Sequence, residues 1–404
     1  MKNINSKVDL VVIGGGPGGY TAAFRAADLG KNVILIEKGK QLGGVCLNRG
    51  CIPSKALLNI SKVINNAMEG TNYGVYFKKP EIDINKIQRW KNDIILNLND
   101  GIKKLAESRK IKIINGTGEF KSATQIFIKD NQGKDINIFF NDCIIATGSR
   151  SQVIPYLDKK HPSIMTSKDA LNLSSIPKSL LVIGGGYIGL ELGTVFASLG
   201  SKITVAEYLP DLLSMADIDL VNPLNKKLNT IFENIYLSTE VTSLIPQTNG
   251  NIIATFKNKN TTFKNSFEKV LICTGRKANT DNIFIEKTGV KLDEKGLIPV
   301  NHQRRTLIPN IYAIGDVTGA PTLAHKASFE GKVAAEVIAG MNSIYKPSAI
   351  PSVIYTSPEI AWAGYTEKEL KKLSKRYNKA VFPWSASGRA MTMNATNGKT
   401  KILT

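Results

Sequence analysis

Histidine and cysteine are scarce in this sequence. Only three histidines and four cysteines occur among 404 residues, and four cysteines do not make the disulfide framework of a small secreted domain. The one close pair, Cys46 and Cys51, has no cluster of histidine or cysteine nearby, so it is a poor zinc site and we expect no bound metal. Cys143 and Cys273 lie in apolar, strand-like stretches, where we expect them to be buried as small hydrophobic residues.

Long apolar runs are also missing. No stretch reaches the ~18 apolar residues of a membrane span, and no apolar segment with a cleavage site precedes the strand-like run at residues 8–13. The sequence therefore predicts a cytoplasmic protein without a membrane partner. Its length exceeds that of one typical hydrophobic core, so we expect two or three domains.

Negative charge is in deficit, and the formal net charge is +20. A nucleic-acid-binding surface would explain this excess if the basic residues formed a stripe interleaved with aromatic residues. The lysines are instead scattered among asparagines and isoleucines, and all three residue types have A/T-rich codons. Mutational bias is the simpler interpretation, and we expect no nucleic-acid partner.

Residues 43–55 read GGVCLNRGCIPSK and place Cys46 and Cys51 five positions apart, just before an apolar helical pattern. In a regular α-helix, Cα atoms at this spacing lie about 8.6 Å apart, whereas a disulfide needs about 7 Å or less. If the two cysteines pair, the turn between them cannot be ideal helix, and Gly50 is the residue that most easily absorbs the distortion. A strained, accessible disulfide is typical of redox-active pairs.

A glycine-rich turn at residues 14–19 stands between a strand-like run and a helical stretch, and the following strand ends at Glu37. This order of strand, turn, helix, strand and acid is typical of a dinucleotide site. Gly14, Gly16 and Gly19 allow the close approach of a pyrophosphate, and the acid accepts a hydrogen bond from a ribose hydroxyl.

The same pattern returns in the middle of the chain. Gly184, Gly186 and Gly189 form the second turn, and Glu207 follows the last of them by 18 residues, the same interval as in the first copy. Two dinucleotide sites of one architecture suggest two cofactors that exchange electrons. We therefore expect an α/β fold with two Rossmann-like domains.

The cysteine segment and the two glycine turns together resemble the flavin disulfide reductases, the class I pyridine nucleotide-disulfide oxidoreductases, and within them the dihydrolipoamide dehydrogenases. The resemblance covers residues 8–404. It implies an FAD-binding domain formed by residues 1–152 and 278–349, an NAD-binding domain at 153–277, and the start of an α+β interface or dimerisation domain at 350–404.

The resemblance also implies catalytic roles for four residues. Cys46 is the interchange thiol that meets dihydrolipoamide, Cys51 is the flavin-proximal thiol, Lys55 approaches the flavin ring, and Glu191 is the ion-pair partner of Lys55. In the implied cycle a substrate thiolate attacks Cys46, the second substrate thiol closes oxidised lipoamide, and electrons pass through FAD to NAD⁺.

Further residues are implied to bind the cofactors. Those for FAD are Gly14, Gly16, Gly19, Glu37, Lys38, Gly44, Lys55, Gly118, Thr147, Gly148, Ser149, Asp316 on the ribityl chain, and Ala324. Those for NAD are Gly184, Gly186, Gly189, Glu207, Val241 and Gly275. The carboxylate of Glu207 would repel a 2′-phosphate, which favours NAD over NADP. Tyr187 could gate the nicotinamide pocket or pack as an aromatic plug.

The family's general base is a histidine followed five residues later by a glutamate, near the end of the interface domain, and it serves the partner subunit of a homodimer. The sequence ends before that point, so we expect a C-terminally truncated chain without the base, a loss that typically costs ~10²–10⁴-fold in rate. His161, with threonine five residues later, His302 in a polar loop, and His325 on a helix do not match that pattern.

Three functions are compatible with these patterns. The first is dihydrolipoamide oxidation, with lipoyl groups carried by an E2 acyltransferase or by the glycine-cleavage H protein. The second is another flavin disulfide reductase such as mercuric reductase, which needs an additional C-terminal cysteine pair. The third is a flavoprotein that binds FAD and NAD and has only diaphorase-like activity, the oxidation of NADH by a dye.

Overall fold

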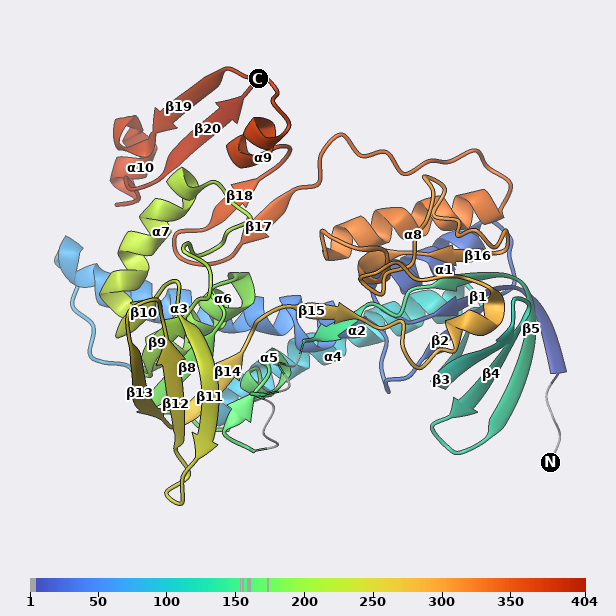
Figure 1. The fold of residues 1–404 in the computed structure, drawn as a ribbon, viewed down its shortest axis with the longest axis horizontal. Coiled ribbons are helices and arrows are strands. Elements are labelled where there is room, and N and C mark those ends of the chain that lie inside the picture. Colours follow the sequence, from blue (N-terminus) through green and yellow to red (C-terminus); the bar gives the residue numbers. More distant parts are fainter. Residues whose placement is uncertain (1–4, 153, 155, 158–160, 173) are drawn as a thin grey trace. The chain divides into compact units, whose positions relative to one another are not determined.

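The computed structural model describes residues 5–152, 154, 156–157, 161–172 and 174–404. The chain forms two compact units, each assembled from three stretches (Figure 1). The first unit contains Met1–Pro53, Trp90–Arg150 and Arg276–Pro347, and the second contains Ser54–Arg89, Ser151–Gly275 and Ser348–Thr404. Positions 153, 155, 158–160 and 173 of the expected NAD-binding domain lie outside the described residues.

The first unit is built on a six-stranded sheet. Five strands run parallel in the order β3-β2-β1-β5-β16, and β4 lies antiparallel between the long outer ends of β3 and β5. The strands are β1 (Asn5–Ile13), β2 (Val33–Glu37), β3 (Lys112–Ser122), β4 (Gln125–Asp130), β5 (Asp135–Ile145) and β16 (Ile311–Ala313). Leu10, Val11 and Val12 are all fully buried, as expected for a parallel strand that is covered on both faces.

Two strands of this sheet are longer than the sequence pattern predicts. The sequence pattern predicts a short strand at residues 111–114, ahead of residues 116–118, and two separate strands at 136–140 and 142–146. In the structure residues 116–118 lie inside β3, and β5 is continuous from Asp135 to Ile145. Ile126, Ile128 and Ile138 alternate with more exposed neighbours and are fully buried. This alternation binds the extended ends of the strands into the core, because every second side chain faces the same side of a sheet.

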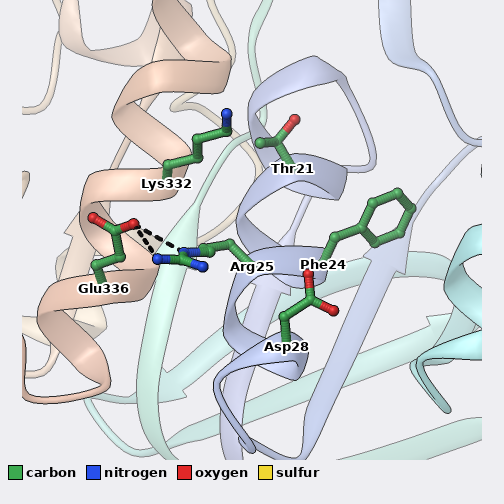
Figure 2. A pocket seen from close by; sticks show the side chains of 6 residues that line it. All are labelled: Thr21, Phe24, Arg25, Asp28, Lys332 and Glu336. Atoms are coloured by element: carbon green, nitrogen blue, oxygen red, sulfur yellow. Dashed lines mark hydrogen bonds and ion pairs between the residues drawn. The ribbon is translucent and has the colours of Figure 1, made fainter.

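Helices α1 (Pro17–Asp28) and α8 (Ala324–Ile338) pack side by side in the first unit (Figure 1). A Cβ atom at Gly331 would lie 2.6 Å from the carbonyl oxygen of Gly18, so only glycine permits this crossing. At one side of the helix pair Arg25 Nη2 lies 2.7 Å from Glu336 Oε1. Figure 2 shows this ion pair in a shallow surface pocket that is lined by Thr21, Phe24, Arg25, Asp28, Lys332 and Glu336.

The second unit contains a five-stranded parallel sheet in the order β10-β9-β8-β14-β7 and an antiparallel sheet in the order β11-β12-β13. The parallel strands are β7 (Ile164–Met165), β8 (Ser179–Ile183), β9 (Lys202–Ala206), β10 (Asn234–Tyr236) and β14 (Lys269–Ile272). The antiparallel strands are β11 (Glu240–Pro246), β12 (Ile252–Lys257) and β13 (Thr262–Phe267). Helices α5 (Ser167–Ala170), α6 (Tyr187–Leu199) and α7 (Ile218–Ile231) belong to this unit.

The prediction that residues 56–115 are mainly helical with a central loop is confirmed. Helix α3 (Cys51–Glu69) and the short 3₁₀ helix η1 (Gly70–Tyr73) precede the loop, and α4 (Ile84–Ser108) follows it. Asp83 begins α4 by accepting a hydrogen bond from the Lys86 N–H at 3.0 Å, the interaction that commonly caps a helix start.

The C-terminal stretch of the second unit consists of two short hairpins and two short helices (Figure 1). They are β17 (Ser352–Ile354), β18 (Ile360–Trp362), α9 (Glu367–Lys372), β19 (Lys379–Pro383), α10 (Gly388–Thr392) and β20 (Lys399–Leu403). Lys401 Nζ lies 2.7 Å from both Asp217 and Asp219 at the start of α7, and only 3% of its side chain is exposed. Among the residues that the structure describes, no helix has the length and apolar character of a membrane span.

Candidate active site

The two cysteines of the GGVCLNRGCIPSK segment lie on different helices. Cys46 belongs to α2 (Gly44–Arg49), Cys51 is the first residue of α3, and Gly50 between them has φ −148° and ψ −106°. The predicted departure from ideal helix at Gly50 is thus confirmed. Cys51 is exposed, whereas Cys46 is half-buried.

The cysteine segment is held directly against the first glycine turn. Gly44 has φ +59°, and a Cβ atom there would lie 2.6 Å from the Cα of Gly16. The Gly43 N–H also donates to the Gly15 carbonyl at 2.7 Å. Backbone therefore meets backbone at this point, and the helix that carries Cys46 begins beside the turn predicted to bind a pyrophosphate.

The first glycine turn has the close packing that a dinucleotide site requires. A Cβ atom at Gly14 would lie 2.3 Å from the Ala146 carbonyl oxygen, and one at Gly19 would lie 1.7 Å from the Gly14 carbonyl oxygen. Glu37 Oε2 accepts the Gly15 N–H at 2.8 Å, and Oε1 accepts the Gly39 N–H at 2.7 Å. The carboxylate is thus fixed at the edge of the turn, where it can still accept from a ligand hydroxyl.

The second glycine turn repeats this arrangement. Glu207 accepts the Gly185 N–H at 2.5 Å and the Leu209 N–H at 2.7 Å. A Cβ atom at Gly189 would lie 2.3 Å from the Gly184 carbonyl oxygen, as Gly19 does with Gly14. Gly186 is the N-cap of α6, and a Cβ atom there would meet nothing within 4 Å, which leaves the helix N-terminus accessible to an anion.

Three polar side chains converge in the first unit, two of them predicted to bind FAD. Ser149 donates its hydroxyl to Asp316 and accepts from Arg276 Nε at 2.7 Å. Arg276 Nε also lies 3.8 Å from Asp316. Arg276 was not among the residues predicted to bind a cofactor.

A reciprocal pair of hydrogen bonds fixes the loop that precedes Ser149. Thr147 Oγ1 donates to the Asn279 carbonyl at 2.7 Å, and Asn279 Nδ2 donates back to the Thr147 carbonyl at 2.9 Å. The Asn279 N–H donates to the Gly148 carbonyl at 2.9 Å. Thr147, Gly148 and Ser149 are therefore held as one unit by residues from a return segment more than 120 positions later.

Ala324 is the first residue of α8, whose first turn packs on the first glycine turn. A Cβ atom at Gly18 would lie 3.0 Å from the Ala327 carbonyl oxygen. The structure thus brings Ala324 and the glycine turn to the same end of two packed helices. The role predicted for Ala324 toward the flavin stays a prediction.

Lys55 and Glu191 form the ion pair predicted from the resemblance. Lys55 Nζ lies 2.8 and 3.1 Å from the two carboxylate oxygens of Glu191. Tyr355 was not predicted: its N–H donates to Glu191 Oε1 at 3.0 Å, and its ring centroid lies 4.4 Å from the Lys55 ammonium. Tyr355 lies 164 positions after Glu191, and no local pattern marks such a contact.

Four predicted cofactor residues lie apart from these clusters. Gly118 lies inside β3, where a Cβ atom would meet Ile126 at 2.9 Å. Val241 is 3% exposed at an irregularity of β11. Lys38 is exposed after Glu37, and the Gly275 carbonyl accepts the Gln152 N–H at 2.9 Å. Their cofactor roles remain predictions.

Cys143 is buried and Cys273 is partly buried, and His161 and His302 make contacts with the backbone. Burial raises the pKa of Cys273 to about 12 and raises the pKa of Cys143 well above its usual value. His161 Nδ1 accepts the Ser163 N–H at 3.2 Å, and His302 Nδ1 lies 3.3 Å from the Tyr345 carbonyl. Tyr187 starts α6 and packs partly buried against the core of the second unit, in agreement with the packing alternative.

Tyr20 is a second residue that the sequence reasoning missed. Burial raises the pKa of its hydroxyl, and the charge of Cys46 raises it further. The Tyr20 hydroxyl is therefore close enough to Cys46 to be affected by its charge.

The two glycine turns suit dinucleotide cofactors. Each offers backbone packed too closely for any side chain, a helix N-terminus, and a fixed carboxylate one strand away. These are the features that hold a pyrophosphate and a ribose. Residues of the first turn, with Ser149 and Asp316, would hold FAD, and residues of the second turn would hold NAD.

Comparison with known families and proteins agrees with this geometry. Residues 8–331 match the family described as pyridine nucleotide-disulphide oxidoreductase, and residues 350–404 match the dimerisation domain of pyridine nucleotide-disulphide oxidoreductases. The C-terminal stretch with its two hairpins is therefore part of a dimerisation domain.

Individual relatives cover nearly the whole chain. A dihydrolipoyl dehydrogenase of Vibrio parahaemolyticus serotype O3:K6 is 44% identical over 397 residues, which are 98% of this chain and 83% of the relative. A dihydrolipoyl dehydrogenase of Buchnera aphidicola subsp. Schizaphis graminum is 45% identical over 396 residues, with the same shares. The Cu(II) complex of the HOCl-induced flavoprotein disulfide reductase RclA from Escherichia coli has 26% sequence identity and a TM-score of 0.86, and the match covers 98% of this chain and 86% of that one.

Proposed function

The chain belongs to the pyridine nucleotide-disulphide oxidoreductase family, and from that premise we propose that it oxidises dihydrolipoyl groups to lipoyl groups with NAD⁺ as the final electron acceptor. It is an NAD-dependent oxidoreductase whose cofactors are FAD and NAD. The lipoyl substrate is the part that the proposal adds.

The contact between Gly44 and Gly16 is the observation that carries the proposal. A Cβ atom on Gly44 would lie 2.6 Å from the Gly16 Cα, so the helix with Cys46 is seated on the first dinucleotide turn. An oxidoreductase that passes electrons between a dithiol and a nucleotide cofactor needs its thiols at such a place. The dihydrolipoyl dehydrogenases among the relatives, 44–45% identical over 98% of this chain, support the choice of a dithiol substrate.

The dithiol chemistry runs through two thiol–disulfide exchanges. A substrate thiolate attacks Cys46 Sγ of the oxidised pair, so that the Cys46–Cys51 bond breaks and Cys51 leaves as a thiolate. The second substrate thiol, on losing its proton, attacks the substrate sulfur bonded to Cys46. The substrate disulfide closes, and Cys46 is released as a thiolate. The substrate loses two electrons and the enzyme's disulfide gains them, which yields the reduced pair.

FAD, when bound, supplies the two-electron chemistry that connects the reduced cysteines with NAD⁺. The protein's own residues orient and balance charge around it. Glu37 and Asp316 of the first unit offer fixed acceptors for hydroxyl groups. Within the second unit, Glu191 and the Tyr355 ring set the position of the Lys55 ammonium. Glu207 holds the second turn and disfavours a 2′-phosphate there by charge repulsion.

The macromolecular partners follow from this substrate. Dihydrolipoyl groups are presented on an E2 acyltransferase or on the glycine-cleavage H protein, and we propose these as partners. A second copy of the chain is the partner expected for the dimerisation domain at residues 350–404.

Two activities of the purified protein test the proposal. The first is NAD⁺ reduction by dihydrolipoamide, and the second is NADH oxidation by an artificial dye. We expect the wild-type protein to show both activities. Cys46→Ser and Cys51→Ser should each lose NAD⁺ reduction by dihydrolipoamide but keep NADH oxidation by the dye. Dye reduction without lipoamide turnover would overturn the proposal in favour of a diaphorase-like flavoprotein. Turnover of a different disulfide or of a metal ion instead would indicate another reductase of the family.

A further inference from the structure

Asn99 is a buried polar residue on α4 whose side chain faces the cysteine segment. It is 5% exposed, and its Nδ2 donates to Asn48 Oδ1 at 2.9 Å. The same nitrogen donates to the Ile95 carbonyl at 2.9 Å and to Gln41 Oε1 at 3.4 Å. All three partners are oxygens, so this amide group is ordered by its surroundings.

The direction of the Asn99 amide follows from those partners. The Leu42 and Gly44 carbonyls only accept hydrogen bonds, so Asn48 turns its NH₂ group toward them and its oxygen toward Asn99. The Ile95 carbonyl is likewise an acceptor, so the group of Asn99 that faces both Ile95 and Asn48 is the NH₂ donor. Asn99 therefore presents a donor to the oxygen of Asn48.

Asn48 stands between the two cysteines and uses its whole amide group. While its Oδ1 accepts from Asn99, its Nδ2 donates to the Leu42 carbonyl at 2.8 Å and to the Gly44 carbonyl at 3.0 Å. A flipped Asn48 would lose all three bonds. Asn99 thus stabilises the orientation in which Asn48 holds the backbone of residues 42–44.

This clamp closes a small loop that contains Cys46. Residues 42–44 accept hydrogen bonds from Asn48 and are also held by the close contact of Gly44 with Gly16. Gly43 and Gly44 both have positive φ. The turn between the cysteines already departs from helix at Gly50, whose φ is −148° and ψ is −106°. Because residues 42–44 are fixed, any backbone adjustment that accompanies disulfide formation or cleavage falls on Gly50 and Cys51.

We propose that Asn99 is a positioning residue for the redox pair, acting through Asn48 to fix the side of the turn that carries Cys46. The inference rests on the proposed function, since it assumes that Cys46 and Cys51 exchange with a substrate dithiol. Asn99 is assigned no contact with substrate or cofactor. Its effect is confined to the geometry that Cys46 presents to an incoming thiolate.

The test compares the holoprotein with Asn99→Leu, a variant of similar volume without a donor. It leaves Asn48 Oδ1 without the Asn99 hydrogen bond, a loss that is worth about tenfold. We expect kcat/KM for dihydrolipoamide to fall about tenfold, while NADH oxidation by a dye stays within about twofold because it bypasses the thiols. The ratio of iodoacetamide labelling at Cys46 to that at Cys51, read by mass spectrometry, should change several-fold.

Two further variants provide the controls. Asn310→Leu removes an amide that also donates to two backbone carbonyls, at 2.8 and 3.1 Å, but these belong to Ala123 and Asn141. It should leave the labelling ratio unchanged. The double variant Asn48→Ala/Asn99→Leu should be no worse than Asn48→Ala alone, because Asn99 acts only through Asn48.

Each result decides the inference separately from the proposed function. Wild-type-like turnover and labelling in Asn99→Leu would overturn it, and so would a parallel fall of lipoamide and dye activities with the melting temperature. Additive effects in the double variant would also overturn it. If the wild-type protein lacks lipoamide turnover, the proposed function fails, while the labelling ratio still decides whether Asn99 positions Cys46.

Discussion

The Lys55 ammonium lies 2.8 Å from Glu191 Oε2, yet the two groups differ sharply in exposure: 32% of the Lys55 side chain is exposed and 3% of that of Glu191. The Glu191 carboxylate is therefore buried against its partners, whereas the Lys55 side chain is partly exposed to solvent. Glu191 fixes the lysine, and the lysine is the member of the pair that can serve a ligand.

The first prediction follows from this asymmetry. Lys55→Met leaves the buried Glu191 carboxylate without its cation, and we expect the protein to lose about 2 kcal/mol, less than a fully buried pair because Lys55 is partly exposed. Adding Glu191→Gln should recover most of the loss, since the neutral amide can still accept the Tyr355 N–H. Thermal unfolding followed by circular dichroism measures both. A single variant as stable as the wild type would contradict the asymmetry.

The second prediction concerns the contact of Gly44 with Gly16. A Cβ atom on Gly44 would meet the Gly16 Cα at 2.6 Å, and neither backbone can move cheaply. We expect Gly44→Ala to separate α2 from the glycine turn, and the purified protein to retain little FAD, as measured by flavin absorbance per chain.

A matched control separates this clash from simple backbone strain. Gly74 has φ +82°, and a Cβ atom there would meet nothing within 4 Å. Gly74→Ala therefore carries the strain of a positive φ without a clash, and it should keep its flavin. Equal flavin content in both alanine variants would remove the argument for the backbone contact.

The third prediction concerns coenzyme choice. Glu207→Ala removes the charge that repels a 2′-phosphate, so the preference for NADH over NADPH, as a ratio of kcat/KM values, should fall about tenfold. The KM for NADH should rise as well, because Gly185 and Leu209 lose their acceptor. Glu37→Ala is the matched control from the first turn and should alter FAD retention but not the preference. An unchanged ratio in Glu207→Ala would show that the selectivity lies elsewhere.

Some of these sites could be predicted from the sequence and others could not. The glycine turns and their acids are local patterns whose residues must be close in space because they are close along the chain. The break at Gly50 follows from helix geometry and the spacing of two cysteines. Tyr355 beside Lys55 and Asn99 beside Asn48 have no such signal, because they depend on which distant segments the two folds bring together.

Strand lengths were misjudged for a related reason. The β3 and β5 strands continue past glycines and polar residues that look like turns, because each strand changes partner along its length. A strand that is paired on both sides tolerates residues that would end an isolated one. The sequence shows local preference, whereas pairing is a property of the whole sheet.

The fourth prediction concerns thiol reactivity and pH. Only the thiolate reacts with iodoacetamide, and burial raises the pKa of Cys273 to about 12 and that of Cys143 well above normal. We expect two labelled cysteines per folded, reduced chain between pH 7 and about 9, and one in Cys46→Ser. Mass spectrometry counts the labels.

The same raised pKa values affect stability. The two buried thiols favour folding fully below the ordinary thiol pKa of about 8.5, and this contribution is lost as the pH rises toward 12. The melting temperature should therefore fall on the alkaline side. Labelling of Cys143 or Cys273 at pH 7 in folded protein would show that these thiols are more accessible than the structure places them.

The fifth prediction concerns the attachment of the C-terminal stretch. Lys401→Met removes the cation between Asp217 and Asp219, and we expect a loss of about 2 kcal/mol at pH 7. Burial opposes the charge of Asp219, but hydrogen bonding and attraction to Lys401 outweigh it and hold the pKa of Asp219 below its usual value. The stabilisation is therefore present above pH ~4 and is lost as the pH falls through the lowered pKa. Melting temperatures of the two proteins should converge in acid, and a constant difference down to pH 2 would contradict the assignment.

The two glycine turns also bear on the protein's history. Leu213 donates its N–H to the Gly185 carbonyl just as Gly43 donates to Gly15, so the two copies share even the bonds that fasten the following loop. They diverge at the next step, where the first copy runs into the cysteine helix and the second into α7. Duplication of one ancestral nucleotide-binding half, followed by divergence of a single loop, would leave this pattern. In such a lineage the sulfur chemistry was grafted onto an older module that had evolved to hold a nucleotide.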